Sequence, residues 1–341
     1  MAKGSLALLI SGGVDNWAPD LWKSRFAEKL KDRDIALLPA DNVDPDQVHY
    51  AAVWQPKPGL LRAFSNLKAI FNLGAGVDAV LQDSSLPDVP LVRVADDDLT
   101  SRMTEYVVMH VLMHHRQQAY LANCQSKRIW APRPQWPARA VRVGVLGLGV
   151  LGRDAARALY NLGFPVAGWS KSRKSIDGVE CYAGDGQLGA FLARTDILVV
   201  LLPLTQETRG MLARPLFRQL ATDGPLGGPV VINAGRGGLQ NEEDILACLE
   251  DGTLKAATLD VFQREPLPSD SPLWSHPAVT ISPHNAADSD PDSIASYVAA
   301  QILDFEAARL LKSIALAIDK NRSSVVVQGR VIASPSPAPH A

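Results

Sequence analysis

The sequence predicts an α/β protein with two parallel-sheet units, on three observations. At 341 residues the chain is long enough for two domains. Short apolar, β-branched runs alternate with helical patterns both before and after residue 140. A parallel sheet covered by helices on both faces produces this alternation. The second series opens at residue 141, where an apolar run ends in a glycine-rich turn that leads directly into a helical pattern.

The first series predicts a complete small α/β unit. Its helices are expected at residues 21–30 and 60–67, and its strands at 6–10, 35–38, 51–54, 69–73 and 91–94. A long helix, apolar on one face, is expected from about residue 102 to 121. The arm at 130–137 follows and cannot be helical throughout, because it contains three prolines.

The second series predicts a larger sheet. Its strands are expected at 141–146, 166–169, 197–202, 230–232, 256–259 and 278–281. A helix is expected to begin at Asn241, since a capping residue is followed by three acidic residues. A helix at 294–311 is expected to pack back on the first unit. The tail at 324–341, rich in Pro, Ser and Ala, is expected to be disordered.

Composition excludes several classes of protein. A net charge of −2 predicts no general attraction to nucleic acid or to an acidic membrane. Three widely spaced cysteines argue against a disulfide framework and against a cysteine-based metal site, and fit a reducing compartment. The apolar stretch at 6–10 is too short for a signal peptide, and no run approaches a membrane span. We therefore expect a cytoplasmic protein without metal, membrane or nucleic-acid partners.

The glycine turn is the motif GLGVLG at residues 147–152. A strand, this motif and a helix in that order predict a dinucleotide-binding site. Gly147 would permit the tight turn, Gly149 would let N–H groups approach a pyrophosphate, and Gly152 would let the helix pack closely on the strand. The N–H groups at the helix start, including those of Val150 and Leu151, would face the phosphates. The alternative is a glycine-rich turn in an ordinary α/β unit.

The tip of the next strand predicts which dinucleotide binds. A site specific for NAD places an acidic residue there, on the adenosine ribose. Here the sequence is SKSRK at 170–174, without an acid. Ser170, Ser172, Arg173 and Lys174 are expected to bind a 2′-phosphate through charge-assisted hydrogen bonds, so NADP(H) is preferred over NAD(H). The alternative is a solvated basic loop.

Three further side chains follow strands of the second unit. Arg236, Glu265 and His284 each come after a different strand, and ligands bind at the carboxyl ends of strands in open α/β sheets. Hydride transfer to a 2-keto acid develops negative charge on the keto oxygen, which a histidine can protonate. Glu265 would keep His284 charged and oriented, and Arg236 would bind the carboxylate and keto oxygen. Taken singly, they could be a salt-bridge partner, a surface-turn residue and a helix-start residue.

Over residues 5–322 the chain resembles the D-isomer-specific 2-hydroxyacid dehydrogenase family. The motifs that carry the resemblance are GLGVLG at 147–152, LPLTQETRG at 202–210, NAGRG at 233–237, LDVFQREP at 259–266 and SPHNAA at 282–287. The sequences WSKSRK at 169–174 and LGAGVD at 73–78 resemble the NADPH-dependent glyoxylate/hydroxypyruvate reductase branch.

The resemblance implies further site residues. Arg236, Glu265 and His284 would hold the roles given above. The N–H groups of Gly74, Ala75 and Gly76 would bind the substrate carboxylate, with Trp54 as a pocket wall or, alternatively, plain core. Asp260 would hold the nicotinamide carboxamide. The residues expected beside the cofactor are Leu202, Pro203, Thr208, Ala234, Gly235 and Arg236.

The resemblance also implies the domain organisation. Residues 1–101 and 287–323 would form a flavodoxin-like substrate domain, and 102–286 the NADP(H)-binding domain, with the active site in the cleft between them. The family is typically homodimeric, and the helix and arm at 102–139 would form the dimer contact.

The function expected is NADPH-dependent reduction of glyoxylate or hydroxypyruvate, giving the D-hydroxy acid where the product is chiral, with His284 as general acid. Two alternatives stay open: a reductase of bulkier acids such as phenylpyruvate or hydroxyphenylpyruvate, and a nucleotide-sensing protein without turnover. Formate oxidation is disfavoured, because it does not call for a cationic imidazole paired with a carboxylate.

His114 and His115 are the remaining candidates. Adjacent helix residues point in different directions, which argues against a shared metal ion. His114 falls on the apolar face of the predicted helix and is a candidate for lining the crevice.

Overall fold

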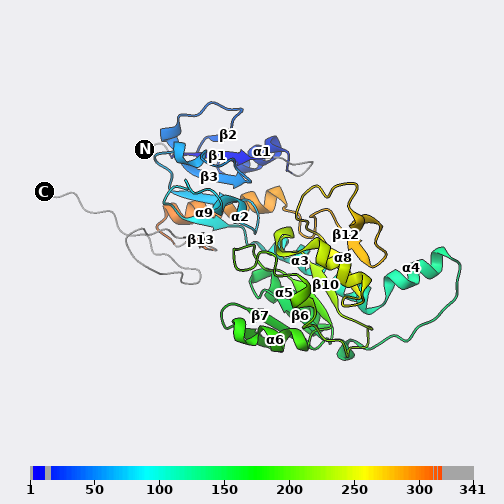
Figure 1. Cartoon of the computed structure of the whole chain (residues 1–341). Helices are drawn as coiled ribbons and strands as arrows, with labels where there is room; N and C mark the ends of the chain where they lie inside the picture. The colour runs from blue at the N-terminus through cyan, green and yellow to red at the C-terminus, as the bar shows by residue number, and fades with distance from the viewer. Residues whose placement is uncertain (1–2, 12–16, 310, 313, 317–341) are drawn as a thin grey trace. The chain divides into compact units, whose positions relative to one another are not determined.

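The computed structural model describes residues 3–11, 17–309, 311–312 and 314–316. They form two compact α/β units (Figure 1). Unit 1 comprises the described residues of Met1–Leu99 and Ser289–Ala341, and unit 2 comprises Thr100–Asp288. The prediction of two parallel-sheet units is therefore confirmed, whereas the expected disordered tail at 324–341 lies outside the described residues. None of the helices formed by the described residues has the length and apolar character needed to cross a membrane.

The sheet of unit 1 has the strand order β13-β5-β4-β3-β1-β2. Its strands are β1 (Ser5–Ile10), β2 (Ile35–Leu37), β3 (Val48–Trp54), β4 (Ala69–Asn72), β5 (Leu91–Arg93) and β13 (Ile314–Leu316). The first five are parallel and follow the flavodoxin-like order 2-1-3-4-5. They correspond to the five predicted strands. The unpredicted β13 adds an antiparallel edge to β5.

The helices of unit 1 are α1 (Pro19–Lys29), the short α2 (Asp78–Leu81) and α9 (Pro291–Glu306), with 3-10 turns at Pro45–Gln47 and Leu61–Ala63. The helix predicted at 60–67 is wrong beyond that single turn. Ser65 and Asn66 instead donate side-chain hydrogen bonds to Asp46, and such polar side chains compete with helix formation. The helix α9 packs on α1 as predicted, but it ends before residue 311, with Ala308 in the left-handed region at φ +55°.

An ion pair with a buried arginine anchors the end of α9 in unit 1. Both terminal nitrogens of Arg33 donate to the Glu306 carboxylate, at 3.0 and 2.9 Å. The Arg33 side chain is fully buried, and the Tyr50 hydroxyl donates to the same carboxylate. Burial alone would raise the pKa of Glu306, but its hydrogen bonds and the charge of Arg33 lower it.

The sheet of unit 2 has the order β12-β11-β10-β9-β6-β7-β8, all parallel. Its strands are β6 (Val143–Leu146), β7 (Val166–Ser170), β8 (Glu180–Ala183), β9 (Ile197–Val200), β10 (Val230–Asn233), β11 (Ala256–Leu259) and β12 (Val279–Ile281). Its helices after β6 are α5 (Val150–Asn161), α6 (Asp185–Ala193), α7 (Arg214–Phe217) and α8 (Glu242–Glu250). The six predicted strands are present. The edge strand β8 was missed because its sequence, ECYA, carries no apolar run and no side chain in it is fully buried.

The predicted start of α8 is confirmed. The Asn241 side chain accepts a hydrogen bond from the Asp244 N–H, as a helix cap does. Unit 2 also contains 3-10 turns at Ala138–Ala140, Gly237–Leu239 and Pro272–Ser275.

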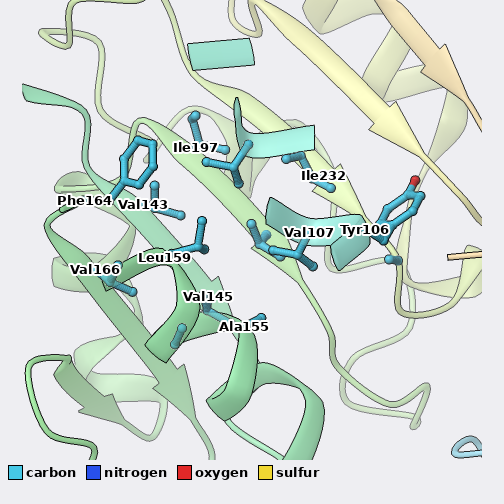
Figure 2. Close-up of a cluster of buried hydrophobic side chains, with 14 of the residues drawn as sticks. Tyr106, Val107, Val143, Val145, Ala155, Leu159, Phe164, Val166, Ile197 and Ile232 are labelled. Atoms are coloured by element: carbon cyan, nitrogen blue, oxygen red, sulfur yellow. The ribbon is translucent and has the colours of Figure 1, made fainter. Parts of the chain in front are cut away.

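The helix predicted at 102–121 is two helices, α3 (Asp97–His115) and α4 (Gln118–Ser126). The break lies at Gln117, which adopts φ +56°, and its side chain donates to the carbonyl of Pro134 in the arm. Tyr106 and Val107 of α3 pack with Val143 and Val145 of β6 in one of the core clusters of unit 2 (Figure 2). The apolar face predicted for this helix is therefore buried against the sheet.

Replacing Glu306 with Gln tests the anchor of α9. The substitution leaves the Arg33 guanidinium buried without its paired carboxylate, so the free energy of unfolding should fall by about 2 to 3 kcal/mol at neutral pH. A carboxyl whose folded pKa is lowered stabilises the fold above its unfolded pKa, about 4.3, and loses that effect in acid. The difference between wild type and variant in urea unfolding should therefore shrink as the pH falls.

Glu28 provides the matched control, because its ion pair with Arg25 is exposed. Glu28→Gln should change stability by less than about 0.5 kcal/mol. If the two glutamate variants were equally stable, Arg33 and Glu306 would not anchor α9.

Candidate active site

The glycine turn after β6 requires glycine at two of its three positions. Gly147 has φ +115°, and a Cβ there would lie 2.7 Å from the carbonyl oxygen of Leu201. A Cβ on Gly152 would lie 1.8 Å from the carbonyl oxygen of Gly147, so only glycine lets α5 pack this closely on the turn. At Gly149 a Cβ would meet no atom within 4 Å. The space beside Gly149 is therefore open to a ligand.

The N-terminus of α5 begins directly at this open space. Gly149 is its N-cap, no side chain caps the helix, and its first turn contains no acidic residue. The first N–H groups of an α-helix have no intrahelical acceptor and carry partial positive charge. With Val150 and Leu151 as the first helical residues, this end of α5 can bind an anionic group such as a pyrophosphate.

The tip of β7 is basic but partly engaged in its own structure. The Ser170 hydroxyl donates to the carbonyl of Ser172 at 2.7 Å and so shapes the turn. Lys171 pairs at 2.5 Å with Glu207, from the loop after β9, and both side chains are largely exposed. Arg173 is exposed and Lys174 half-buried, and neither side chain forms a hydrogen bond or ion pair with another described residue. Those two cations are the ones available to a 2′-phosphate.

The loop after β9 is closed by Thr208. Its hydroxyl donates to the carbonyl of Pro203 at 2.8 Å and accepts the N–H of Thr205 at 2.8 Å. Leu202 is buried while Pro203 is exposed. Thr208 therefore holds the loop, in which Pro203 is accessible to a ligand.

The turn that carries Arg236 is built by a buried amide that sequence reasoning missed. Asn233, at the end of β10, accepts the N–H of Gly235 and donates to the carbonyl of Arg236 and to the side chain of Gln240. Gln240 in turn donates to the carbonyl of Val261. Ala234 and Gly235 are buried, whereas Arg236 is half-buried and donates to the Gly235 carbonyl. In the sequence, Asn233 and Gln240 on either side of the glycines were the signal that could have indicated this side-chain support of the turn.

Glu265 and His284 meet directly. The His284 Nδ1 and the Glu265 Oε2 lie 2.6 Å apart, and the other carboxylate oxygen accepts the N–H of Phe262 at 2.9 Å. Burial alone would raise the pKa of Glu265, but the hydrogen bonds from His284 and Phe262, with the charges of His284 and Arg236, lower it. Because β10, β11 and β12 are neighbouring parallel strands, the predicted trio follows one edge of the sheet.

Asp260, at the end of β11, is almost fully buried and holds the loop of His284. Its Oδ1 accepts the Ser282 hydroxyl and the N–H of Asn285, and its Oδ2 accepts the N–H of Ala286. Burial raises the pKa of Asp260, against the effect of these hydrogen bonds. One lone pair of Oδ2 is left for the predicted contact with a carboxamide.

In unit 1, the loop after β4 is held by a buried asparagine. Asn72 donates to the carbonyls of Gly74 and Gly76, at 2.7 and 2.9 Å. Among the described residues, none accepts a hydrogen bond from the N–H groups at 74–76, so these groups are suited to binding a carboxylate. Trp54, at the end of β3, lies against this loop: a Cβ on Gly74 would be 2.5 Å from its ring. Trp17 stacks on Trp54 with ring centroids 4.4 Å apart.

His114 does not join the residues above. Its Nε2 shares a 2.8 Å hydrogen bond with the Thr258 hydroxyl in the middle of β11, and burial lowers its pKa to about 4. It is therefore a neutral residue that joins α3 to the sheet. The described residues contain no group of three or more His, Cys, Asp or Glu side chains that could hold a metal ion.

Comparison with known proteins matches this architecture to one family. The model described as "D-isomer specific 2-hydroxyacid dehydrogenase, NAD binding domain" matches residues 108–286. A glyoxylate/hydroxypyruvate reductase A from Yersinia enterocolitica is 42% identical over 294 residues, which cover 84% of this chain and 92% of that relative.

Two solved structures are similar over nearly the whole chain. One is the NADPH-dependent glyoxylate/hydroxypyruvate reductase of Sinorhizobium meliloti in complex with NADP and sulfate, with 44% identity and a TM-score of 0.86, covering 92% of this chain and 98% of that one. The other is a probable 2-hydroxyacid dehydrogenase from Rhizobium etli in complex with NADP, HEPES and L(+)-tartaric acid, with 44% identity and a TM-score of 0.86, covering 93% and 98%. These matches confirm the resemblance inferred from the motifs.

Proposed function

The chain belongs to the D-isomer-specific 2-hydroxyacid dehydrogenase family, and we propose that it reduces small 2-keto acids such as glyoxylate and hydroxypyruvate with NADPH. Where the product is chiral, it is the D-hydroxy acid. The observation that carries the proposal is the 2.6 Å contact between His284 and Glu265, in the same unit as the glycine turn. A histidine held by a carboxylate can supply the proton that reduction of a keto group requires.

The residues present fit a bound NADPH. The open space at Gly149 and the uncapped start of α5 suit its pyrophosphate. Arg173 and Lys174, on a β7 tip that lacks an acid, suit its 2′-phosphate. Pro203 and the remaining lone pair of Asp260 would lie by the nicotinamide. The two solved relatives described above contain NADP, which supports the same choice here.

The proton would come from His284. Bound NADPH supplies the hydride to the keto carbon. The charge that develops on the keto oxygen needs a donor, and the imidazolium can give the proton from Nε2 while Nδ1 stays on Glu265. The lowered pKa of Glu265 keeps that carboxylate ionised, so it can hold the ring through Nδ1.

Orientation would come from Arg236 and the glycine loop. A guanidinium can donate to both the substrate carboxylate and the keto oxygen, and so stabilises charge that grows in the transition state. The N–H groups at 74–76 would bind the carboxylate, and Trp54 beside them would limit the size of the 2-substituent. If Trp54 leaves more room, the bulkier acids phenylpyruvate and hydroxyphenylpyruvate become the better substrates.

We also propose that the protein is a homodimer that pairs through 102–139. Within unit 2, α4 and the following arm extend from the sheet (Figure 1). Tyr120 and Gln117 fix the arm by donating to the carbonyls of Ala131 and Pro134. Trp130 is 97% exposed beside a groove of about 500 Å³ that Leu121 and Ile129 help to line. Large exposed apolar side chains on an ordered arm favour a protein partner, and a second copy fits the family expectation.

The proposal is tested first by NADPH absorbance. Wild type should oxidise NADPH with glyoxylate or hydroxypyruvate, and less efficiently with phenylpyruvate, as kcat/KM. His284→Ala should lower kcat by about 10²- to 10⁴-fold, because the proton donor is lost. Glu265→Gln should lower kcat, because the ring loses the charge-assisted hydrogen bond at Nδ1 that holds it.

His276→Ala serves as the control, since His276 lies at the end of a surface turn and only accepts a hydrogen bond from the Ala278 N–H. It should retain wild-type kcat. Wild-type protein that binds NADPH but turns over no 2-keto acid would support the sensor alternative instead. Near-full activity in His284→Ala would remove His284 from the role of acid.

The cofactor preference is tested at the β7 tip. Arg173→Ala, alone and with Lys174→Ala, should raise KM for NADPH by about 10-fold per lost charge-assisted contact and leave KM for NADH nearly unchanged. Arg218→Ala removes an exposed arginine elsewhere in unit 2 and should change neither. An equal rise in KM for NADPH and for NADH would show that this loop does not bind the 2′-phosphate.

The dimer proposal is tested by Trp130→Asp. A charge in the centre of an apolar contact should convert the dimer to a monomer in sedimentation velocity, whereas Trp274→Asp, at an exposed tryptophan in the 3-10 turn Pro272–Ser275, should not. A wild-type protein that sediments as a monomer would rule the dimer out.

A further inference from the structure

A chain of hydrogen bonds links α3 to the loop that carries His284. The Tyr106 hydroxyl lies 2.7 Å from the Ser282 Oγ, and the Ser282 hydroxyl donates to the Asp260 Oδ1 at 2.7 Å. A serine has one hydroxyl proton, and here it goes to the carboxylate. Tyr106 must therefore donate to Ser282. The direction of the chain is fixed, from α3 toward Asp260.

The loop at 282–286 is folded around Asp260. Besides the Ser282 hydroxyl, the carboxylate accepts the N–H groups of Asn285 and Ala286, at 3.0 and 3.1 Å. The backbone carbonyl of Asp260 accepts the N–H of His284 at 2.8 Å. Each residue from 284 to 286 is thus tied to Asp260 by its own N–H group. These hydrogen bonds to an ionised Asp260 fix the position of the backbone that carries the imidazole.

The loop needs this support, because His284 adopts φ +55°. A residue other than glycine is strained in the left-handed region, and such a conformation persists only where its surroundings hold it. The hydrogen bonds to Asp260 supply that restraint. Weakening them should let the backbone relax and move the imidazole relative to Glu265.

Tyr106, the first donor of this hydrogen-bond chain, is held firmly by the core of unit 2. Its ring belongs to the core cluster shown in Figure 2, with 7% of the residue exposed, and it contacts the tilted ring of His110. Figure 2 shows its hydroxyl oxygen directed away from the other labelled side chains of the cluster. Burial raises the pKa of Tyr106, so its hydroxyl stays protonated and remains a donor. The packed core thereby restrains the Tyr106 end of the hydrogen-bond chain.

We propose that Tyr106 is a positioning residue for His284, acting through Ser282 and the ionised carboxylate of Asp260. The inference rests on the proposed function, in which His284 is the proton donor. It adds a residue from α3, remote in sequence from the site motifs, to the machinery that sets the position of the imidazole. Because α3 lies in the segment proposed to form the dimer contact, this helix would serve both roles.

The arrangement has a consequence for pH. The groups that face Asp260 are Ser282, Tyr106 behind it, His284, and the N–H groups of Asn285 and Ala286. Burial raises the pKa of Asp260, and the hydrogen bonds and the charge of His284 oppose that rise. Removing a donor from the hydrogen-bond chain should raise the pKa of Asp260 further. A protonated Asp260 holds the loop less well, so the variants should lose loop order at a higher pH than wild type as the solution is acidified.

The test measures amide exchange of 282–288 in the full-length protein without cofactor, which does not depend on activity. Tyr106→Phe should speed exchange in this segment by about 3- to 10-fold, the effect of one hydrogen bond. Ser282→Ala should speed it more, because it removes the direct donor, and Ser282→Thr should restore it. Acidification should enlarge the difference between Tyr106→Phe and wild type.

Tyr50→Phe is the matched control, because it also removes a buried tyrosine hydroxyl that donates to a carboxylate, but in unit 1. It should leave exchange at 282–288 unchanged. Exchange that rises equally in Tyr50→Phe and Tyr106→Phe would indicate general destabilisation and overturn the proposal, as would no change in Tyr106→Phe.

Kinetics provide the second readout. In Tyr106→Phe, kcat with glyoxylate should fall by about 3- to 10-fold with KM for NADPH within about twofold of wild type, and the acid limb of the kcat profile should move to higher pH. An unchanged kcat and acid limb would overturn the inference while leaving the proposed function intact. If wild type itself shows no turnover, the proposed function fails, and the exchange experiment still decides whether Tyr106 positions the loop.

Discussion

The hydrogen bond between Glu265 and His284 is the interaction on which the proposed chemistry depends, and several parts of unit 2 help to form it. The two residues come from loops that follow β11 and β12, so the bond exists only because these strands are parallel neighbours. Phe262 fixes one oxygen of Glu265 by its N–H, and Asp260 fixes the backbone on either side of the imidazole. Glu265 thus holds Nδ1 of His284, which leaves Nε2 as the nitrogen that can transfer a proton to a substrate.

Two carboxylates in the same short segment are given different environments. Asp260 is almost fully buried, its pKa is raised by burial, and its hydrogen bonds go mainly to backbone N–H groups and a hydroxyl. Glu265 is more exposed, and the hydrogen bonds from His284 and Phe262, with the charges of His284 and Arg236, lower its pKa. Environment therefore separates the two carboxylates: Asp260 folds the loop, and Glu265 holds the imidazole. Their spacing in sequence alone does not reveal this division.

Much of the fold was predictable because its rules are local. Buried parallel strands read as apolar runs, and the turn at 147–152 can be recognised because two of its glycines are demanded by backbone contacts within a few residues. Arg236, Glu265 and His284 were predictable as a set because parallel strands end at one edge. What escaped prediction depends on partners distant in sequence. Asn72, Asn233 and Gln240 are ordinary polar residues until the fold buries them against carbonyls, and the break at Gln117 arises where the arm returns. The helix predicted at 60–67 is likewise wrong because Ser65 and Asn66 form hydrogen bonds with Asp46, which is distant in sequence.

The hydrogen bond between the His284 Nδ1 and Glu265 is the most direct test of the account. Proton NMR of protein with labelled histidine, assigned with the His284→Ala variant and recorded with NADPH bound, reports this bond without turnover. The account predicts a strongly downfield Nδ1 proton resonance in wild type that moves upfield or disappears in Glu265→Gln. Absence of this resonance in wild type, or a resonance unaffected by Glu265→Gln, would contradict the account, because the carboxylate would then not hold the imidazole.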